Sequence, residues 1–175
     1  MATYNLDPTH ATAAFSIKHL MISKVRGSFQ KLSGQLTYDA KNPAGSSIEV
    51  AIEAASINTS EPQRDAHLKS ADFFDVEKFP VITFKSKQFQ KSDDGFKVVG
   101  DLTIHGVTKQ VTLEMEEPTD ELKDPWGNIK MGVSGTTKIK RKDFGLTWNA
   151  ALETGGVVVG DEVSITLDVE FAKAA

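Results

Sequence analysis

Apolar and polar residues alternate with a period of two along most of this chain. In the first such segment, Phe15, Ile17, His19 and Met21 fall on one face and the residues between them fall on the other. Because successive side chains of a β-strand point to opposite faces, each segment predicts a strand with one apolar face. The same pattern predicts further strands at residues 32–38, 48–54, 81–84, 96–104, 111–115, 129–139 and 163–171.

One short helical segment interrupts the strands between residues 55 and 84. Ser60, followed three residues later by Gln63, predicts a capping box at its start, and Pro62 lies in the first turn, where no amide donor is needed. Asp72-Phe73-Phe74 and Phe79-Pro80 then end the helical pattern. An amphiphilic insert between strands predicts a wall or a lid of a β fold rather than a catalytic loop.

About eight long strands at hairpin-like spacing are typical of a β-sandwich or an up-and-down barrel. The barrel is favoured because the strands are long and each has a single apolar face. Gly34, Gly100 and Gly135 also fall within these apolar faces, where a missing side chain permits a strand to bend or leaves space inside. We therefore expect one all-β domain spanning residues 1–175, closed into a barrel that can hold one small ligand.

Composition narrows the classes of function. The chain has 175 residues, a formal net charge of −4 and no cysteine, which excludes disulfides and thiolate chemistry. Its basic residues are scattered, which argues against nucleic acid as a partner, and no segment has the length of a membrane-spanning helix. The first residues lack the basic start and apolar core of a signal peptide. The product as written is therefore expected in the cytoplasm, whereas a mature form with its signal removed would be periplasmic.

The motifs of common enzymes are absent from the sequence, including G-x-S-x-G, H-E-x-x-H and a phosphate-binding glycine loop. The four histidines are not at metal-ligand spacing from one another. We therefore expect no catalytic residue, no metal site and no cofactor. His19 on its apolar strand face and His67 on the helix each have two interpretations. Each is either a hydrogen-bonded structural histidine or an anchor for the head group of a ligand. As an anchor, the histidine would gain a positive charge at about pH 6.5.

The inward apolar positions also allow two interpretations, a solid core or the lining of a slot. Aromatic and methionine side chains that alternate with glycine favour the slot, because the flexible thioether of methionine can follow a mobile chain. One end of the slot is then closed by a plug of Phe73, Phe74 and Phe79, or these residues form a homodimer contact if they are exposed. Trp126, in a loop, either contacts the rim of the slot or packs against the protein. The predicted ligand-binding residues are Phe15, Ile17, His19, Met21, Phe29, Leu36, Ile52, His67, Phe74, Phe84, Val98, Gly100, Leu102, Met131 and Val133.

Several motifs in a fixed order extend over nearly the whole chain. They are Asp7–His10 before Phe15–His19, Val25–Phe29, Ser56–Thr59, Arg64–Phe74, Phe79–Pro80, Gly100–Thr108, Arg141–Trp148 and Val159–Val163. Through them the chain resembles the YceI-like family, lipocalin-like barrels that bind polyisoprenoid or other long-chain lipids. The resemblance implies an extended eight-stranded antiparallel up-and-down barrel whose elongated apolar interior accommodates a lipid tail. Many family members are exported to the periplasm, and this chain differs from them because its first residues do not form a signal peptide.

We therefore predict a non-enzymatic protein that binds, transports or stores a long-chain isoprenoid lipid, such as a polyprenyl phosphate or a quinone tail. Burial of the tail would supply the affinity, at about 0.8 kcal/mol for each methylene. Two alternatives stay open. One is an acid–base enzyme that acts on an isoprenoid or quinone through His19 or His67, and the other is a stress-linked structural or interaction protein whose cavity is incidental.

Overall fold

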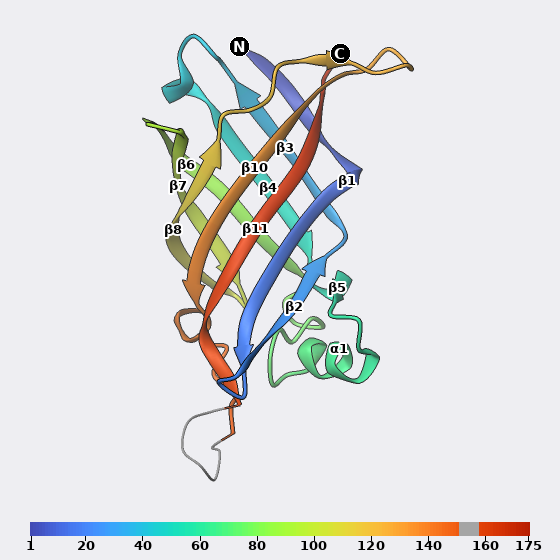
Figure 1. The fold of residues 1–175 in the computed structure, drawn as a ribbon, viewed down its shortest axis with the longest axis vertical. Coiled ribbons are helices and arrows are strands. Elements are labelled where there is room, and N and C mark those ends of the chain that lie inside the picture. Colours follow the sequence, from blue (N-terminus) through green and yellow to red (C-terminus); the bar gives the residue numbers. More distant parts are fainter. Residues whose placement is uncertain (151–157) are drawn as a thin grey trace.

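The computed structural model describes residues 1–150 and 158–175, and its strands close into an elongated barrel (Figure 1). Each strand pairs antiparallel with its neighbours, and the last strand returns to pair with the first. The predicted all-β fold, an up-and-down barrel of eight strands with one short helix, is confirmed for these residues. In barrel order the strands are β1 (Ala2–His19), β3 (Leu32–Tyr38), β4 (Ser47–Glu53), β6 (Val81–Ser92), β7 (Gly95–Ile104), β8 (Val107–Glu116), β10 (Ile129–Lys140) and β11 (Val159–Lys173).

Shorter elements complete the described part of the chain. The helix lies in the insert between β4 and β6, and none of the helices in the described residues is long and apolar enough to cross a membrane. These shorter elements are β2 (Ser23–Phe29), β5 (Ile57–Asn58), α1 (Pro62–Lys69), β9 (Leu122–Lys123), and the 3-10 turns η1 (Pro43–Gly45), η2 (Ala54–Ser56) and η3 (Arg141–Phe144).

The alternation of the sequence fails to predict β2, because Gly27 stands at one of its inward positions. β3 pairs with the first half of β1, and β2 pairs with the second half. The two strands therefore lie end to end along the same side of β1. A Cβ added at Gly27 would lie 2.6 Å from the ring of Phe15, the residue paired with it. Phe15 therefore supplies the apolar side chain that the sequence of β2 lacks.

The first strand extends further toward the N-terminus than the alternation predicts, and it also ends earlier. It spans Ala2–His19, and the next two residues, Leu20 and Met21, adopt a left-handed backbone with φ of 54° and 63°. Alternation needs an extended backbone, so the prediction that Met21 shares the face of Phe15 is wrong. Met21 lies on the turn after β1, where 51% of it is exposed.

The helix starts one residue later than the predicted capping box implies. Glu61 is the N-cap, and its carboxylate accepts a hydrogen bond of 3.0 Å from the Gln63 amide. Pro62 occupies the first helical position, and proline favours an extended backbone in the residue before it. Glu61 has that conformation, with φ −139° and ψ 106°, whereas Ser60 is left-handed with φ 63°. The predicted Ser60 cap is therefore wrong.

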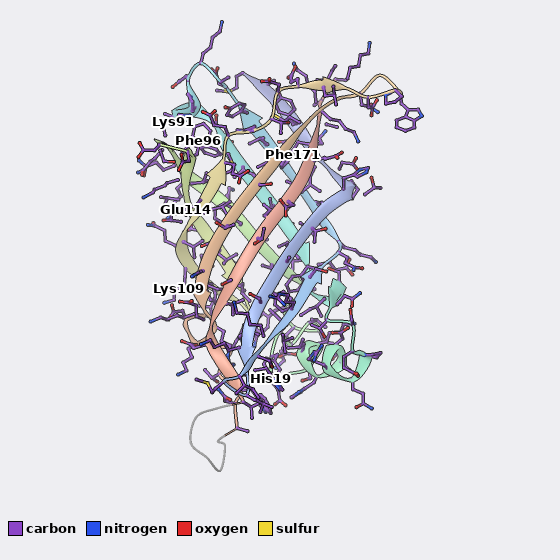
Figure 2. The ribbon with its side chains drawn as sticks, viewed as in Figure 1. His19, Lys91, Phe96, Lys109, Glu114 and Phe171 are labelled. Atoms are coloured by element: carbon purple, nitrogen blue, oxygen red, sulfur yellow. The ribbon has the colours of Figure 1, made fainter. Side chains whose placement is uncertain are left out.

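Side chains fill the half of the barrel that lies away from α1, which we call the packed half. Leu36, Val98 and Phe171 are 0% exposed and Phe96 is 2% exposed. Figure 2 shows Phe96 and Phe171 in this half, and the Phe96 ring contacts Phe89 with 6.1 Å between centroids. Here the inward faces form a solid core, one of the two arrangements that the sequence allows.

We expect Leu36→Ala to lower the free energy of unfolding by about 2–5 kcal/mol, because the packed half cannot close over the void. Urea denaturation followed by circular dichroism measures the change. Leu122→Ala is the control, since Leu122 is 72% exposed and surface substitutions usually change stability by less than about 0.5 kcal/mol. Equal losses in both variants would contradict a solid core at this level of the barrel.

Candidate functional site

An apolar cavity of about 180 Å³ lies in the other half of the barrel, beside α1, which we call the hollow half. Its wall combines inward residues of the strands with residues from the insert that contains α1. The wall residues are Ala13, Ala14, Phe15, Ile17, Phe29, Val50, Ile52, Leu68, Phe73, Phe74, Ile82, Phe84, Leu102, Ile104, Val111, Leu113, Thr137, Ile139, Arg141, Leu146, Val159, Val163, Ile165 and Leu167.

Gly100 and Gly135, on the inward faces of their strands, are covered by side chains of neighbouring strands. A Cβ added at Gly100 would lie 2.7 Å from the Phe84 ring, and a Cβ added at Gly135 would lie 3.0 Å from Leu113. These glycines therefore let larger side chains lean across the wall, and they do not create the empty space themselves. Gly100, predicted as a ligand contact, lies behind Phe84, and Phe84 forms the wall at this point.

Residues 62–79, which we call the lid, cover the cavity beside the strands. Leu68, Phe73 and Phe74 of the lid belong to the cavity wall. Phe74 packs edge-on against Phe29 of β2 with 5.6 Å between ring centroids, and its amide donates a hydrogen bond of 3.0 Å to the Leu68 carbonyl. Phe73 is 7% exposed. Within one chain, Phe73 and Phe74 therefore have the environment of a plug.

Arg141 directly follows β10 and is 3% exposed. Its guanidinium donates hydrogen bonds to the carbonyl oxygens of Gly160 at 2.8 Å, Leu146 at 2.8 Å and Trp148 at 2.9 Å. Burial lowers the pKa of this guanidinium, and the charge of Asp161 opposes the shift. Arg141 therefore connects Leu146 and Trp148 to Gly160 of β11 through their backbone carbonyls, which replace a carboxylate partner.

The cavity wall is almost entirely hydrocarbon, and its polar side chains form hydrogen bonds within the protein. Arg141 and Thr137 are the wall residues with polar side chains. The Thr137 hydroxyl donates to the Thr112 carbonyl at 3.0 Å, and the Arg141 N–H groups bind the carbonyls named above. Across the described residues, no buried side-chain nitrogen or oxygen lacks a hydrogen-bond partner. Such a wall suits an apolar chain and disfavours a charged or polar group inside.

The predicted ligand-binding residues divide between the two halves of the barrel. Leu36, Val98, Met131 and Val133 are buried in the packed half and do not line the cavity. The alternation marks every inward position of a strand in the same way, so it does not distinguish a filled level of the barrel from a hollow one. The predicted residues that line the cavity are Phe15, Ile17, Phe29, Ile52, Phe74, Phe84 and Leu102.

Neither predicted histidine belongs to the cavity wall. His67 packs against Phe73 with 5.0 Å between ring centroids and against Trp148 with 4.8 Å, and its Nε2 is 2.8 Å from the Asp72 carboxylate. His19 is the last residue of β1, at the end of the barrel near α1 (Figure 2). The environment of His67 is that of a structural partner, whereas a head-group contact by His19 stays a prediction.

Several wall residues are missed by the sequence analysis. Val163, Ile165 and Leu167 line the cavity from β11, and their alternation predicts the strand without indicating which level of the barrel is hollow. Arg141 lies within a family motif, but a charged residue at the end of a strand is ordinarily exposed. Its burial depends on carbonyls such as that of Gly160, which is 19 residues away in sequence.

A cluster of charged side chains lies where β1 bulges away from β11. The register between these strands shifts here, and Asp7 and His10 approach Glu170 within the distances of a metal site. The Lys130 ammonium is 2.7 Å from Asp7 and 3.4 Å from Glu170, so a lysine already balances the carboxylates. The hydrogen bond from Lys130 holds the pKa of the Asp7 carboxyl well below its usual range. The geometry is that of an ion-pair network.

Known proteins resemble this chain over nearly its full length. The profile of the YceI-like domain family matches residues 4–171. A UPF0312 protein of Yersinia enterocolitica is 41% identical over 175 residues, which cover 99% of this chain and 88% of that protein. The crystal structure of Burkholderia cenocepacia BcnA superposes with a TM-score of 0.82 at 23% identity, covering 94% of this chain and 98% of that chain.

A polyisoprenoid binding domain from Saccharophagus degradans, implicated in plant cell wall breakdown, has the same fold. It superposes with a TM-score of 0.69 at 17% identity, covering 99% of this chain and 100% of that chain. At such identities, the matches to the Burkholderia and Saccharophagus structures show a shared fold. The Yersinia relative and the family profile show shared ancestry along the sequence.

We expect Arg141→Met to lower the free energy of unfolding by about 1–3 kcal/mol, because buried carbonyl oxygens lose their donors. The neighbouring variant Lys142→Met is the matched control, since the Lys142 side chain is exposed. Urea denaturation of both variants measures the difference. If the two variants lose the same amount, the guanidinium does not hold the β10–β11 connection.

The lowered pKa of Asp7 predicts how stability depends on pH. Because the folded pKa lies below that of an unfolded aspartate, about 3.9, the unfolded chain takes up the proton first as the pH falls. The contribution of Asp7 is therefore complete above about pH 5 and is lost as the pH falls toward the folded pKa. In Asp7→Asn, the loss of stability between about pH 7 and about pH 3 should be smaller than in the wild type.

Urea denaturation at the two pH values measures this difference. Asp93→Asn, in the exposed turn between β6 and β7, is the control and should keep the pH dependence of the wild type. An unchanged pH dependence in Asp7→Asn would mean that the pairing of Asp7 with Lys130 does not contribute to the folded state.

Proposed function

The chain belongs to the YceI-like domain family, and from this premise we propose that its barrel binds the hydrocarbon chain of an isoprenoid or other long-chain lipid without converting it. The observation that carries the proposal is the cavity of about 180 Å³, whose polar wall residues are already hydrogen-bonded within the protein. The similar domain from Saccharophagus degradans is described as polyisoprenoid binding. An apolar wall binds such a chain through burial alone.

The size of the cavity limits how much of a lipid it accepts with the lid in place. A cavity of about 150 Å³ lined by Leu, Ile and Phe binds benzene, which is close in size to a single isoprene unit. A cavity of about 180 Å³ therefore holds roughly one such unit. At about 0.8 kcal/mol per methylene, this burial does little more than offset the cost of association.

To bury a longer chain, the cavity must become larger. We propose that it does so when the lid moves outward. Leu68, Phe73 and Phe74 are wall residues that lie outside the barrel strands. Their outward movement leaves the strand pairing of the barrel intact, whereas enlarging the cavity between strands would break backbone hydrogen bonds. Affinity should consequently rise with the length of the chain.

The head group of the lipid would lie outside the cavity. The polar wall residues Thr137 and Arg141 already bond carbonyls of the protein, and an unpaired polar group inside an apolar site costs several kcal/mol. We therefore propose that polyprenyl phosphates and quinones both bind mainly through their tails, and that the protein transports or stores them. A head-group contact by His19, at the end of β1 beyond the wall residue Ile17, is part of this proposal.

Acid–base catalysis receives less support from this geometry. His67 and Asp72 form a hydrogen-bonded pair, but Phe73 belongs to the cavity wall and His67 does not. A chain in the cavity would contact Phe73 before it reached the imidazole. A homodimer, a link to stress and the cellular compartment stay predictions from the sequence.

We expect the lipid-free protein to bind geranylgeraniol more tightly than the shorter geraniol, by on the order of tenfold or more, because more hydrocarbon is buried. Titration followed by native mass spectrometry measures both affinities. Ile165→Trp should weaken geranylgeraniol binding by at least about tenfold, because the larger ring enters the cavity from its wall. Thr166→Trp is the matched control, since Thr166 is the next residue of β11 and does not line the cavity.

Circular dichroism shows whether both variants keep the fold. Unchanged binding by a folded Ile165→Trp would place the lipid elsewhere and contradict the proposal. Absence of binding by the wild type, together with recombinant protein that carries no lipid, would support the alternative of an incidental cavity.

A further inference from the structure

Consecutive apolar residues are exposed on the turn between β1 and β2. Leu20 is 37% exposed, Met21 is 51% exposed and Ile22 is 85% exposed. The turn lies at the end of the barrel near α1, directly after His19, which Figure 2 labels. We call Leu20–Ile22 the apolar turn. Large side chains that project together from the tip of a hairpin form a compact surface for contact with a partner.

The backbone of the apolar turn adopts a conformation that large apolar residues rarely take. Leu20 and Met21 have φ of 54° and 63°, in the region that favours glycine, asparagine and aspartate in hairpin turns. Hydrogen bonds from the Leu20 amide to Val158 at 2.7 Å and from the Ile22 amide to His19 at 3.2 Å hold it there. Glycine or asparagine would suit the fold better, which indicates that these side chains serve an external contact.

Basic residues flank the apolar turn on the outer face of the same hairpin. Lys18 stands directly opposite Lys24, and Arg26 is the next outward residue of β2. Like charges directly opposite one another destabilise a strand pair, so this arrangement does not serve the pairing. In the described part of the chain, the lysines that form ion pairs are others: Lys31, Lys87, Lys91, Lys130, Lys138 and Lys173.

We propose that the apolar turn inserts into the surface of an anionic lipid bilayer, with Lys18, Lys24 and Arg26 against the lipid phosphates. Apolar insertion and basic contacts are each weak alone, and together they give stable binding at a membrane surface. The complementarity of charge selects an anionic bilayer as the partner of this end.

The charges at the opposite end of the barrel orient the molecule on such a surface. That end carries both termini (Figure 1), the acidic turn Asp93-Asp94 between β6 and β7, and Glu116 at the end of β8. The chain as a whole has a formal net charge of −4. An anionic surface therefore repels that end, whereas Lys18, Lys24 and Arg26 are attracted to it at the end with the apolar turn.

The cavity lies in the same half as the apolar turn. Ile17 and Val159 line the cavity, and Val159 pairs with His19 next to the turn. A bilayer bound at the turn is therefore close to the hollow half. Binding to the bilayer needs no ligand in the cavity, so this inference does not depend on the proposed function.

Sedimentation with lipid vesicles tests the proposal on the full chain. The wild type should bind vesicles of equal phosphatidylcholine and phosphatidylglycerol more tightly than vesicles of phosphatidylcholine alone, by on the order of tenfold. Replacing Leu20, Met21 and Ile22 together by serine should weaken binding to the mixed vesicles by on the order of tenfold or more. Replacing Lys18, Lys24 and Arg26 together by glutamine should remove the preference for anionic vesicles.

The matched control replaces Leu122 and Trp126 by serine, since they are 72% and 84% exposed at the opposite end. This control should bind as the wild type does, and so should Ile165→Trp, which separates membrane binding from filling of the cavity. Equal vesicle binding by the wild type and the folded serine variant of the apolar turn would overturn the proposal. A dimer that the serine substitutions abolish, without vesicle binding by the wild type, would also overturn it in favour of a second copy of the chain.

Discussion

The pairing of β11 with β1 is the constraint on which the rest of the structure depends. These strands come from opposite ends of the chain, and their register extends from Tyr4 opposite Lys173 to His19 opposite Val159. Before they pair, the inward faces of the strands have no common interior. Once they pair, the sheet closes on itself, and the inward side chains of the strands share one interior.

That shared volume is filled unevenly, and the difference creates the candidate site. In the packed half, residues such as Phe96 and Phe171 are almost completely buried. In the hollow half, the closing elements come from outside the strands, with Phe74 in the lid and Arg141 holding the β10–β11 connection. Hydrogen bonds among backbone groups and the Arg141 guanidinium hold this end, so the interior does not need to be filled with side chains to keep its shape.

The two ends of the barrel differ in chemistry as well as in packing. One end combines the cavity, the lid, the apolar turn and its basic neighbours, whereas the other combines the termini with acidic residues. Both proposals therefore place contact with lipids at a single end. A protein with this polarity would receive and release a hydrophobic chain at a membrane surface while the packed half maintains the fold.

The sequence by itself determined where most of the barrel strands lie, although not the left-handed backbone at Leu20, Met21 and Ser60. The period of two predicted at least part of each of the eight barrel strands but not β2, β5 or β9, and Pro62 marked the first turn of α1. Tertiary structure decided which inward positions surround a cavity, because Val98 in the packed half and Leu102 in the cavity wall lie on the same face of β7. It also decided that Phe15 covers Gly27 and that Arg141 is buried. Strand period arises from each residue's own backbone, whereas empty space depends on side chains that meet from distant parts of the chain.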